Sequence, residues 1–116
     1  MIMKDLLIEF LKLYRDDNYI FYGADEDGEQ YRGFYNTSKI NPNEPDLRLY
    51  RADEPRQAGR EFLSLWCKIA KTGRRYLIGN KDGVCYVGLI NLNRFEDNEP
   101  YLTICQVLKF KRSENQ

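Results

Sequence analysis

The chain has 116 residues, 42% hydrophobic and 31% charged, which is typical of one globular domain and excludes wholesale disorder. It contains no histidine, which excludes catalysis by Ser-His or Cys-His pairs and the usual histidine-based zinc sites. Basic and acidic side chains balance at 18 each, but residues 1–58 carry 8 basic and 12 acidic groups, whereas residues 59–116 carry 10 and 6.

The first predicted element is a helix over about residues 3–16. Asp5, Glu9, Lys12 and Asp16 recur at spacings of four, three and four, and leucines and aromatic residues cover much of the remaining surface. Asp5, Glu9 and Lys12 interrupt every apolar run, which is unlike a signal peptide, and nothing approaches the ~20 apolar residues of a membrane span. The sequence therefore predicts a cytoplasmic protein, with this helix packed on a sheet.

An internal repeat follows. Residues 27–51 and 82–106 align without a gap and are identical at nine of 25 positions, including Asp-Gly, an isolated glycine and Asn-Glu-Pro. Asp-Gly predicts a tight hairpin turn, and proline ends a loop because it cannot donate to a strand ladder. Each copy therefore predicts strand, turn, strand, Asn-Glu-Pro loop and strand, within a single domain of two related halves over 1–116.

Residues 60–72 between the two copies fit two structures. Phe62, Leu65, Trp66 and Ile69 share one helical face, and Gly73 would cap that helix, giving a duplicated α-β-β-β unit with a second helix at 58–72. The same residues also alternate as the two faces of a strand that ends at a turn over 71–75. Periodicity alone does not decide between these two structures.

Five short matches between Gly33 and Leu77 carry a resemblance: Gly33, Asn36, Pro45-Asp46, Trp66-x-Lys68 and Gly73-x-x-Tyr76-Leu77. This pattern resembles a group of short domains in phage and plasmid proteins for which no biochemical activity is established. The resemblance implies a mobile-element origin and a β-hairpin at the Trp66–Leu77 end, so we favour the strand. We thus predict an α+β fold, with helix 3–16 packed on an antiparallel, internally duplicated β-meander of about six to seven strands.

Little in the sequence predicts catalysis, a cofactor or a metal. Cys67, Cys85 and Cys105 are too few for a four-ligand zinc site and are widely spaced, so we expect reduced core cysteines. The acidic turn 23–34 places Phe34 where a calcium loop requires a carboxylate. We expect a protein that is not an enzyme and that holds no metal or cofactor.

The candidate binding residues are basic and aromatic. They are Trp66, Lys68, Lys71, Arg74, Arg75, Tyr76, Lys109, Lys111 and Arg112. Such a set suits a protein partner, which we favour because the net charge is zero, or single-stranded nucleic acid, whose bases stack on rings while cations follow phosphates. The resemblance implies a host protein complex as the partner, with inhibition of host defence as one version. A homodimer is a further alternative, and we expect no membrane partner.

Overall fold

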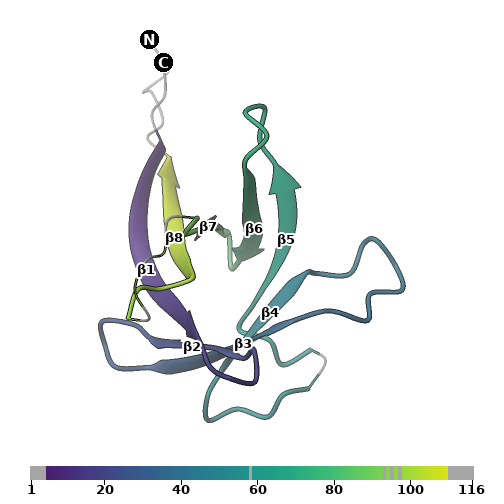
Figure 1. Cartoon of the computed structure of the whole chain (residues 1–116), viewed down its shortest axis with the longest axis vertical. Coiled ribbons are helices and arrows are strands. Elements are labelled where there is room, and N and C mark those ends of the chain that lie inside the picture. Colours follow the sequence, from purple (N-terminus) through teal and green to yellow (C-terminus); the bar gives the residue numbers. More distant parts are fainter. Residues whose placement is uncertain (1–4, 58, 93, 95, 97, 110–116) are drawn as a thin grey trace.

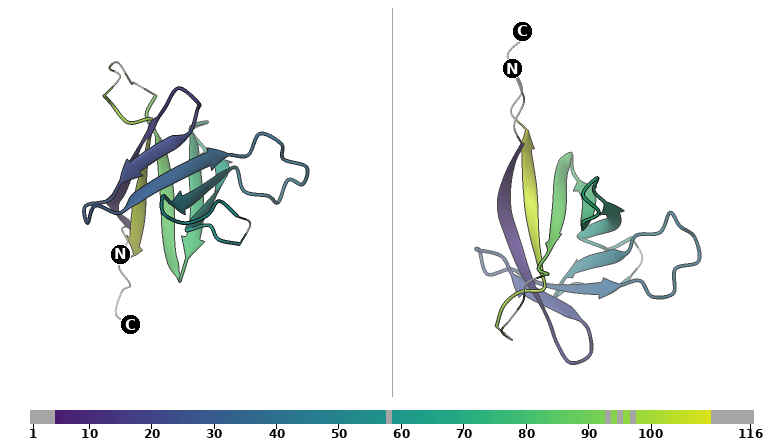
Figure 2. Two further views of the ribbon diagram at one scale, coloured as in Figure 1. Left: turned by 90° about the horizontal axis from the view of Figure 1, so that it is seen from below. Right: turned by 45° about the horizontal axis from the view of Figure 1, so that its top comes forward.

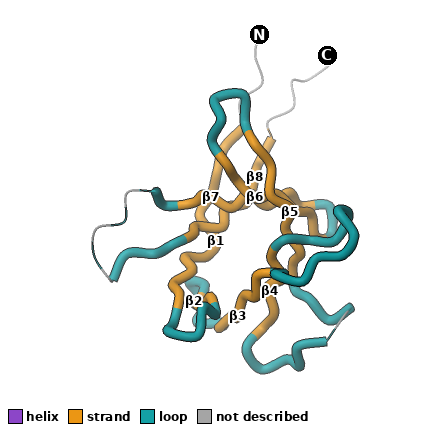
Figure 3. Tube along the Cα trace, turned by 45° about the vertical axis from the view of Figure 1, so that its right-hand side comes forward, coloured by secondary structure: helices purple, strands orange, loops and turns teal. Residues whose placement is uncertain are grey.

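The computed structural model describes residues 5–57, 59–92, 94, 96 and 98–109. Eight antiparallel strands follow one another: β1 (Asp5–Arg15), β2 (Phe21–Ala24), β3 (Gln30–Tyr35), β4 (Leu47–Arg51), β5 (Leu63–Ile69), β6 (Arg75–Lys81), β7 (Val84–Ile90) and β8 (Leu102–Lys109). Each strand pairs with the next, and β8 pairs with β1, which closes a barrel (Figures 1 and 2). Figure 3 shows the ring of strands with loops projecting from it. Because the described residues contain no helix, the predicted α+β class is wrong and the fold is all-β.

The segment predicted as an N-terminal helix contains β1, the longest strand. β1 pairs with β8 from Asp5 to Leu13, and the register shifts between Glu9 and Leu11, so that Phe10 has no partner. Such a bulge adds one residue and changes the phase of the side-chain alternation. The apolar residues before and after the bulge therefore fail to show a single two-residue period, and the strand imitates a helical pattern.

The ambiguous segment 60–72 contains β5, so the strand interpretation is correct and the second helix at 58–72 is wrong; residue 58 lies outside the described residues. Leu63 and Leu65 are buried in the barrel. A turn at 70–74 then leads into β6, closed by the Gly73 amide donating to the Ala70 carbonyl oxygen at 2.8 Å. Gly73 has φ of +88°, a conformation that few other residues adopt.

The two Asp-Gly pairs form different turns. Asp82 and Gly83 both have positive φ (51° and 81°) and connect β6 to β7 as the expected two-residue hairpin. In the first copy the connection spans residues 25–29, and of its Asp-Gly pair only Gly28 has positive φ. There Asp25 Oδ1 accepts hydrogen bonds from the amides of residues 27 and 29, so a side chain, not backbone geometry alone, shapes this longer turn.

Equivalent residues of β1–β4 and β5–β8 occupy equivalent places. Gly23 of β2 pairs with Tyr31 of β3, and Gly79 of β6 pairs with Tyr86 of β7. A Cβ on either glycine would overlap a main-chain carbonyl oxygen of the preceding strand. Close backbone approach therefore requires glycine at both positions.

Leucines and an aromatic cluster fill the barrel. The fully buried side chains are Leu11, Leu13, Leu47, Leu49, Leu63, Leu65, Leu77 and Ile104. Phe10 and Phe62 stack with ring centroids 5.9 Å apart, and the ring of Tyr31 lies 5.7 Å from Phe10 and 5.1 Å from Phe62. Tyr86 completes the cluster at 5.6 Å from Phe10. Because Phe10 lies in β1 and Phe62 directly precedes β5, the cluster joins the two halves of the barrel.

Candidate partner-binding surface

The β5–β6 hairpin brings the central predicted binding residues together. Leu63 and Leu65 point into the barrel, so Trp66 and Lys68 fall on its outer face, where Trp66 pairs with Ile78 and Lys68 with Tyr76. Trp66, Lys68 and Tyr76 therefore share the outer face of the hairpin.

The next strand extends this face with aliphatic residues that the sequence interpretation missed. Ile78 pairs with Val87 of β7, and Tyr76 pairs with Leu89, which is 39% exposed. We call these five outward residues, none of them fully buried, the outer apolar patch: Trp66, Tyr76, Ile78, Val87 and Leu89. Apolar residues in a strand predict burial in a core, so only the register across three strands shows that these five face outward.

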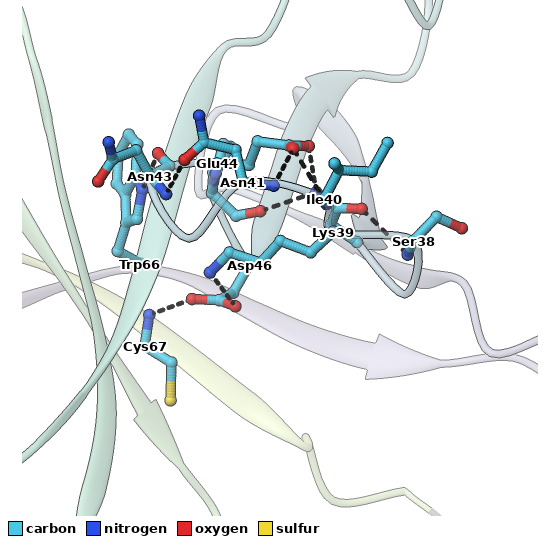
Figure 4. Close-up of polar contacts among 11 residues, drawn as sticks. Ser38, Lys39, Ile40, Asn41, Asn43, Glu44, Asp46, Trp66 and Cys67 are labelled. Carbon is cyan, nitrogen blue, oxygen red and sulfur yellow. Dashed lines mark hydrogen bonds and ion pairs between the residues drawn. The ribbon is translucent and has the colours of Figure 1, made fainter.

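Trp66 lies outside the barrel core. Its indole Nε1 donates to the carbonyl oxygen of Asn43 at 2.9 Å (Figure 4). Its side chain remains partly exposed beside a shallow hollow between the loop over residues 36–46 and the hairpin. That hollow is lined by Pro42, Asn43, Trp66, Lys68, Ile78, Gly79 and Asn80. The hydrogen bond fixes the orientation of the indole ring.

The loop that holds Trp66 is organised by the first Asn-Glu-Pro. The Glu44 carboxylate accepts hydrogen bonds from the amides of Asn41 (2.8 Å) and Ile40 (3.2 Å) and from Asn36 Nδ2 (3.2 Å), which are drawn in part in Figure 4. These bonds, with the Asn41 amide as the largest cause, lower the pKa of Glu44. The Asn-Glu-Pro sequence therefore builds a loop that positions its neighbours.

Asp46, the residue after this proline, ties the loop to β5. Its Oδ2 accepts from the Cys67 amide at 2.8 Å, and its Oδ1 accepts from Lys39 Nζ at 3.1 Å. The Cys67 hydrogen bond is the largest cause of a lowered pKa for the Asp46 carboxyl, and the charges of Lys39 and Lys68 act in the same direction. Asp46 is therefore a structural carboxylate at the edge of the patch.

Some basic side chains of the hairpin lie beside the outer apolar patch: Lys68 on the same face and Lys71 and Arg74 in the adjoining turn, whereas Arg75 alternates with the inward Leu77. Lys68, Lys71, Arg74 and Arg75 are exposed, and residues 63–81 contain five basic and no acidic side chains. Arg74 Nη2 also lies 3.4 Å from the Ile90 carbonyl oxygen, which directs it toward β7. The apolar patch thus has Lys68 and the cations of the β5–β6 turn at one end, although the whole chain is neutral.

The C-terminal candidates are not part of this surface. Lys109 ends β8, where it pairs with Asp5, and β7 separates β8 from β6. Lys111 and Arg112 lie outside the described residues. The structure therefore brings together the six candidates between residues 66 and 76 and leaves Lys109 on a different strand pair.

The described residues contain no group of three or more His, Cys, Asp or Glu side chains that could hold a metal ion. Within the same residues, no helix is long and apolar enough to cross a membrane. No family model, curated protein or solved structure matches the chain.

Proposed function

We propose that the protein is a non-catalytic binding module that docks another protein on the outer apolar patch. The observation that carries the proposal is the register of β5, β6 and β7, which aligns Trp66, Ile78 and Val87 in one row and Tyr76 with Leu89 in the next. A small barrel normally places polar side chains on its solvent face, and contiguous outward apolar residues are typical of interaction sites.

The surrounding charge indicates which partner fits. Lys68 on the patch face, with Lys71 and Arg74 in the adjoining turn, favours a protein that presents carboxylates beside an apolar centre. The absence of histidine from the chain supports binding rather than acid–base catalysis. The resemblance to phage and plasmid domains supports a host protein as that partner and the cytoplasm as the compartment, consistent with three free cysteines.

A pair of matched substitutions tests the proposal. Leu89 in the patch and Tyr22 in β2 are exposed to nearly the same extent, 39% and 40%, but lie on different faces of the barrel. We expect wild type and Tyr22→Glu to bind the same bacterial protein, purified after affinity capture, and Leu89→Glu to bind it at least tenfold more weakly, which corresponds to about 1.4 kcal/mol. Equal binding by all three proteins would exclude the patch.

Single-stranded nucleic acid is the alternative outcome of the same experiment. The aromatic and basic residues of the hairpin could stack on bases and follow phosphates, but Ile78, Val87 and Leu89 offer no stacking surface. Titration with a short single-stranded DNA should therefore leave Trp66 fluorescence unchanged. Salt-sensitive quenching that Arg74→Ala and Arg75→Ala reduce would overturn the protein-binding proposal in favour of nucleic acid.

A further inference from the structure

The first half of β1 has an edge that no described strand covers. β2 pairs with β1 only at Tyr14 and Arg15, so residues 5–9 have β8 on one side and no described strand on the other. Among the described residues, no main-chain hydrogen bond other than those of the β8 ladder reaches this part of β1. Because alternate residues of a strand direct their N–H and C=O groups to opposite sides, every second residue here presents both groups unpaired.

The side chains along this edge are apolar and exposed. Leu6, Leu7 and Ile8 are 46%, 50% and 45% exposed, and Leu108, which pairs with Leu6 from β8, is 42% exposed. β7 pairs with β8 only as far as Val107, so β1 and β8 extend beyond it as a two-stranded ribbon (Figure 1). A two-stranded ribbon is marginally stable in water, and an exposed apolar edge is a template for pairing with another strand.

The protein itself covers the opposite edge of the same strand set, which runs from β5 through β8 to β1. β4 pairs with β5 only at residues 63–65, so residues 66–69 also extend past their neighbour. There the Asp46 carboxylate accepts from the Cys67 amide at 2.8 Å, and the Asp46 amide donates to the Leu65 carbonyl oxygen at 2.9 Å. Loop 36–46 thus takes the place of a strand beside β5, whereas no described loop does so beside β1.

The residue pattern of the free edge fits a second copy of this chain. An antiparallel pair of β1 strands with a two-fold axis at Leu7 places Leu6 opposite Ile8 of the other copy and Leu7 opposite itself, so every central pair is apolar. The neighbouring β8 strands obey the same symmetry, because Leu108 flanks Leu6 and Val107 flanks Leu7. The exposed residues of one copy therefore meet those of the other, and no second sequence is needed to complete the pairing.

We propose that two copies of the chain pair through residues 5–9 of β1, which joins their sheets edge to edge. The contact is isologous, and the covered edge at β5 stops further addition, so a dimer forms rather than a fibre. Leu7 pairs with Val107, which follows the outward alternation of β8, so the two-fold axis leaves both outer apolar patches on one side of the joined sheet. Only this last consequence rests on the proposed function, and dimerisation itself does not.

Sedimentation velocity over a range of protein concentrations tests the proposal. We expect the wild type to pass from monomer to dimer with a dissociation constant of about 1–100 μM, as for a small interface. Leu7→Lys should weaken the dimer by about tenfold or more, because it places two like charges at the two-fold axis and lysine on an edge strand opposes pairing. The matched control is Ile69→Lys, at the exposed end of β5, which should leave the dimer unchanged.

The register of the pairing has its own test. The axis at Leu7 places Glu9 opposite residue 5 of the other copy, which is an aspartate, so a like-charge pair opposes the contact at each end. Glu9 Oε2 also lies 3.7 Å from Lys12 Nζ, but this exposed ion pair contributes little. Glu9→Gln should therefore tighten the dimer by about twofold to fivefold. Unchanged or weaker dimerisation of this variant would exclude the axis at Leu7 and with it the proposed pairing.

Amide hydrogen exchange keeps the test decisive if Leu7→Lys perturbs folding. In the wild type, exchange of the unpaired amides in residues 5–9 should slow by about tenfold or more from monomer to dimer concentrations, whereas exchange in β3 should stay constant. A wild type that remains monomeric up to about 1 mM would overturn the proposal. A dimer that Leu89→Glu dissociates and Leu7→Lys leaves intact would also overturn it, because the outer apolar patch would then be the contact.

Discussion

The two Asn-Glu-Pro loops, residues 36–46 and 91–101, share a backbone design but differ in charge. In both, the asparagine at the start donates from Nδ2 to the proline carbonyl oxygen, at 3.3 Å from Asn36 and 3.0 Å from Asn91. In both, the glutamate side chain accepts from the amide three residues before it, at 2.8 Å. The residue after proline then differs, a carboxylate at Asp46 and a phenol at Tyr101.

This difference distinguishes the residues that both loops require from the residue after proline, which can change between the loops. The asparagine and glutamate contacts stay within their loops and recur, whereas position 46 or 101 makes side-chain contacts outside its loop. Asp46 fastens the first loop to β5 and so positions the Asn43 carbonyl oxygen that holds Trp66. Tyr101 instead gathers Arg15 and Arg94. The asparagine and glutamate shared by the two loops thus stabilise the common loop structure. The residue after proline, which differs, gives each loop different contacts with the rest of the barrel.

The largest expected effect is the loss of stability when Gly23 or Gly79 is replaced, which tests whether both halves of the barrel require glycine at this point. Gly23→Ala and Gly79→Ala each place a Cβ against a main-chain carbonyl oxygen, which a strand cannot move aside cheaply. Each substitution should lower the free energy of unfolding by about 3 kcal/mol or more. Urea denaturation measures the loss, and Gly59→Ala, with open space but positive φ, serves as the control for backbone strain alone. A loss below about 1 kcal/mol at Gly23 or Gly79 would contradict the close approach.

The aromatic cluster allows a second comparison between halves. Phe10→Leu and Phe62→Leu remove equivalent stacked rings. Among the described residues, cations lie over Phe62 but not over Phe10, with Arg51 Cζ at 5.1 Å and Lys81 Nζ at 4.9 Å from the Phe62 centroid. Both substitutions should destabilise the protein by about 1–3 kcal/mol, with Phe62→Leu the more costly by about 0.5–1 kcal/mol. Chemical denaturation of the two variants measures the difference. Equal losses would show that the cations contribute nothing to the cluster.

The structure of β1 shows which features could not be predicted from the sequence: those that depend on pairing with distant strands. The Asp82-Gly83 turn was predictable because its residues carry a local conformational preference, whereas periodicity leaves β5 undecided and the resemblance favours the strand. The predicted helix failed because the bulge at Phe10 is set by pairing with β8, which lies about 95 residues away along the chain. Alternation placed Trp66 and Lys68 on one face, but the neighbours that complete the patch depend on the register of three strands. Arg15 and Tyr101 are 86 positions apart, so no local pattern predicts their contact.

Asp46 should make the first loop sensitive to acid in a way that the second is not. The hydrogen bond from the Cys67 amide and the contact with Lys39 lower the pKa of the folded Asp46 carboxyl below its unfolded value. The resulting stability is present above the unfolded pKa and is lost as the pH falls through the folded pKa. Asp46→Asn should therefore cost about 1 kcal/mol at pH 7 and reduce the slope of stability with pH below about 4. Thermal melting from pH 7 to 2.5 measures both, and an unchanged acid limb would exclude Asp46 as a contributor.

Tyr101→Phe is the matched change in the second loop and should have the smallest effect. The phenyl ring keeps both arginines over its face, and only the hydroxyl that accepts from Arg15 and Arg94 is lost. Because the Arg15 contact is exposed to water, we expect a loss of about 0.5 kcal/mol in unfolding free energy and no change in its pH dependence below pH 4. Thermal melting of the two single variants and of the double variant with Asp46→Asn checks this expectation. Additive losses in the double variant would show that the loops act independently, whereas a coupling of about 1 kcal/mol would indicate that the two ends of the repeat stabilise one another through the barrel.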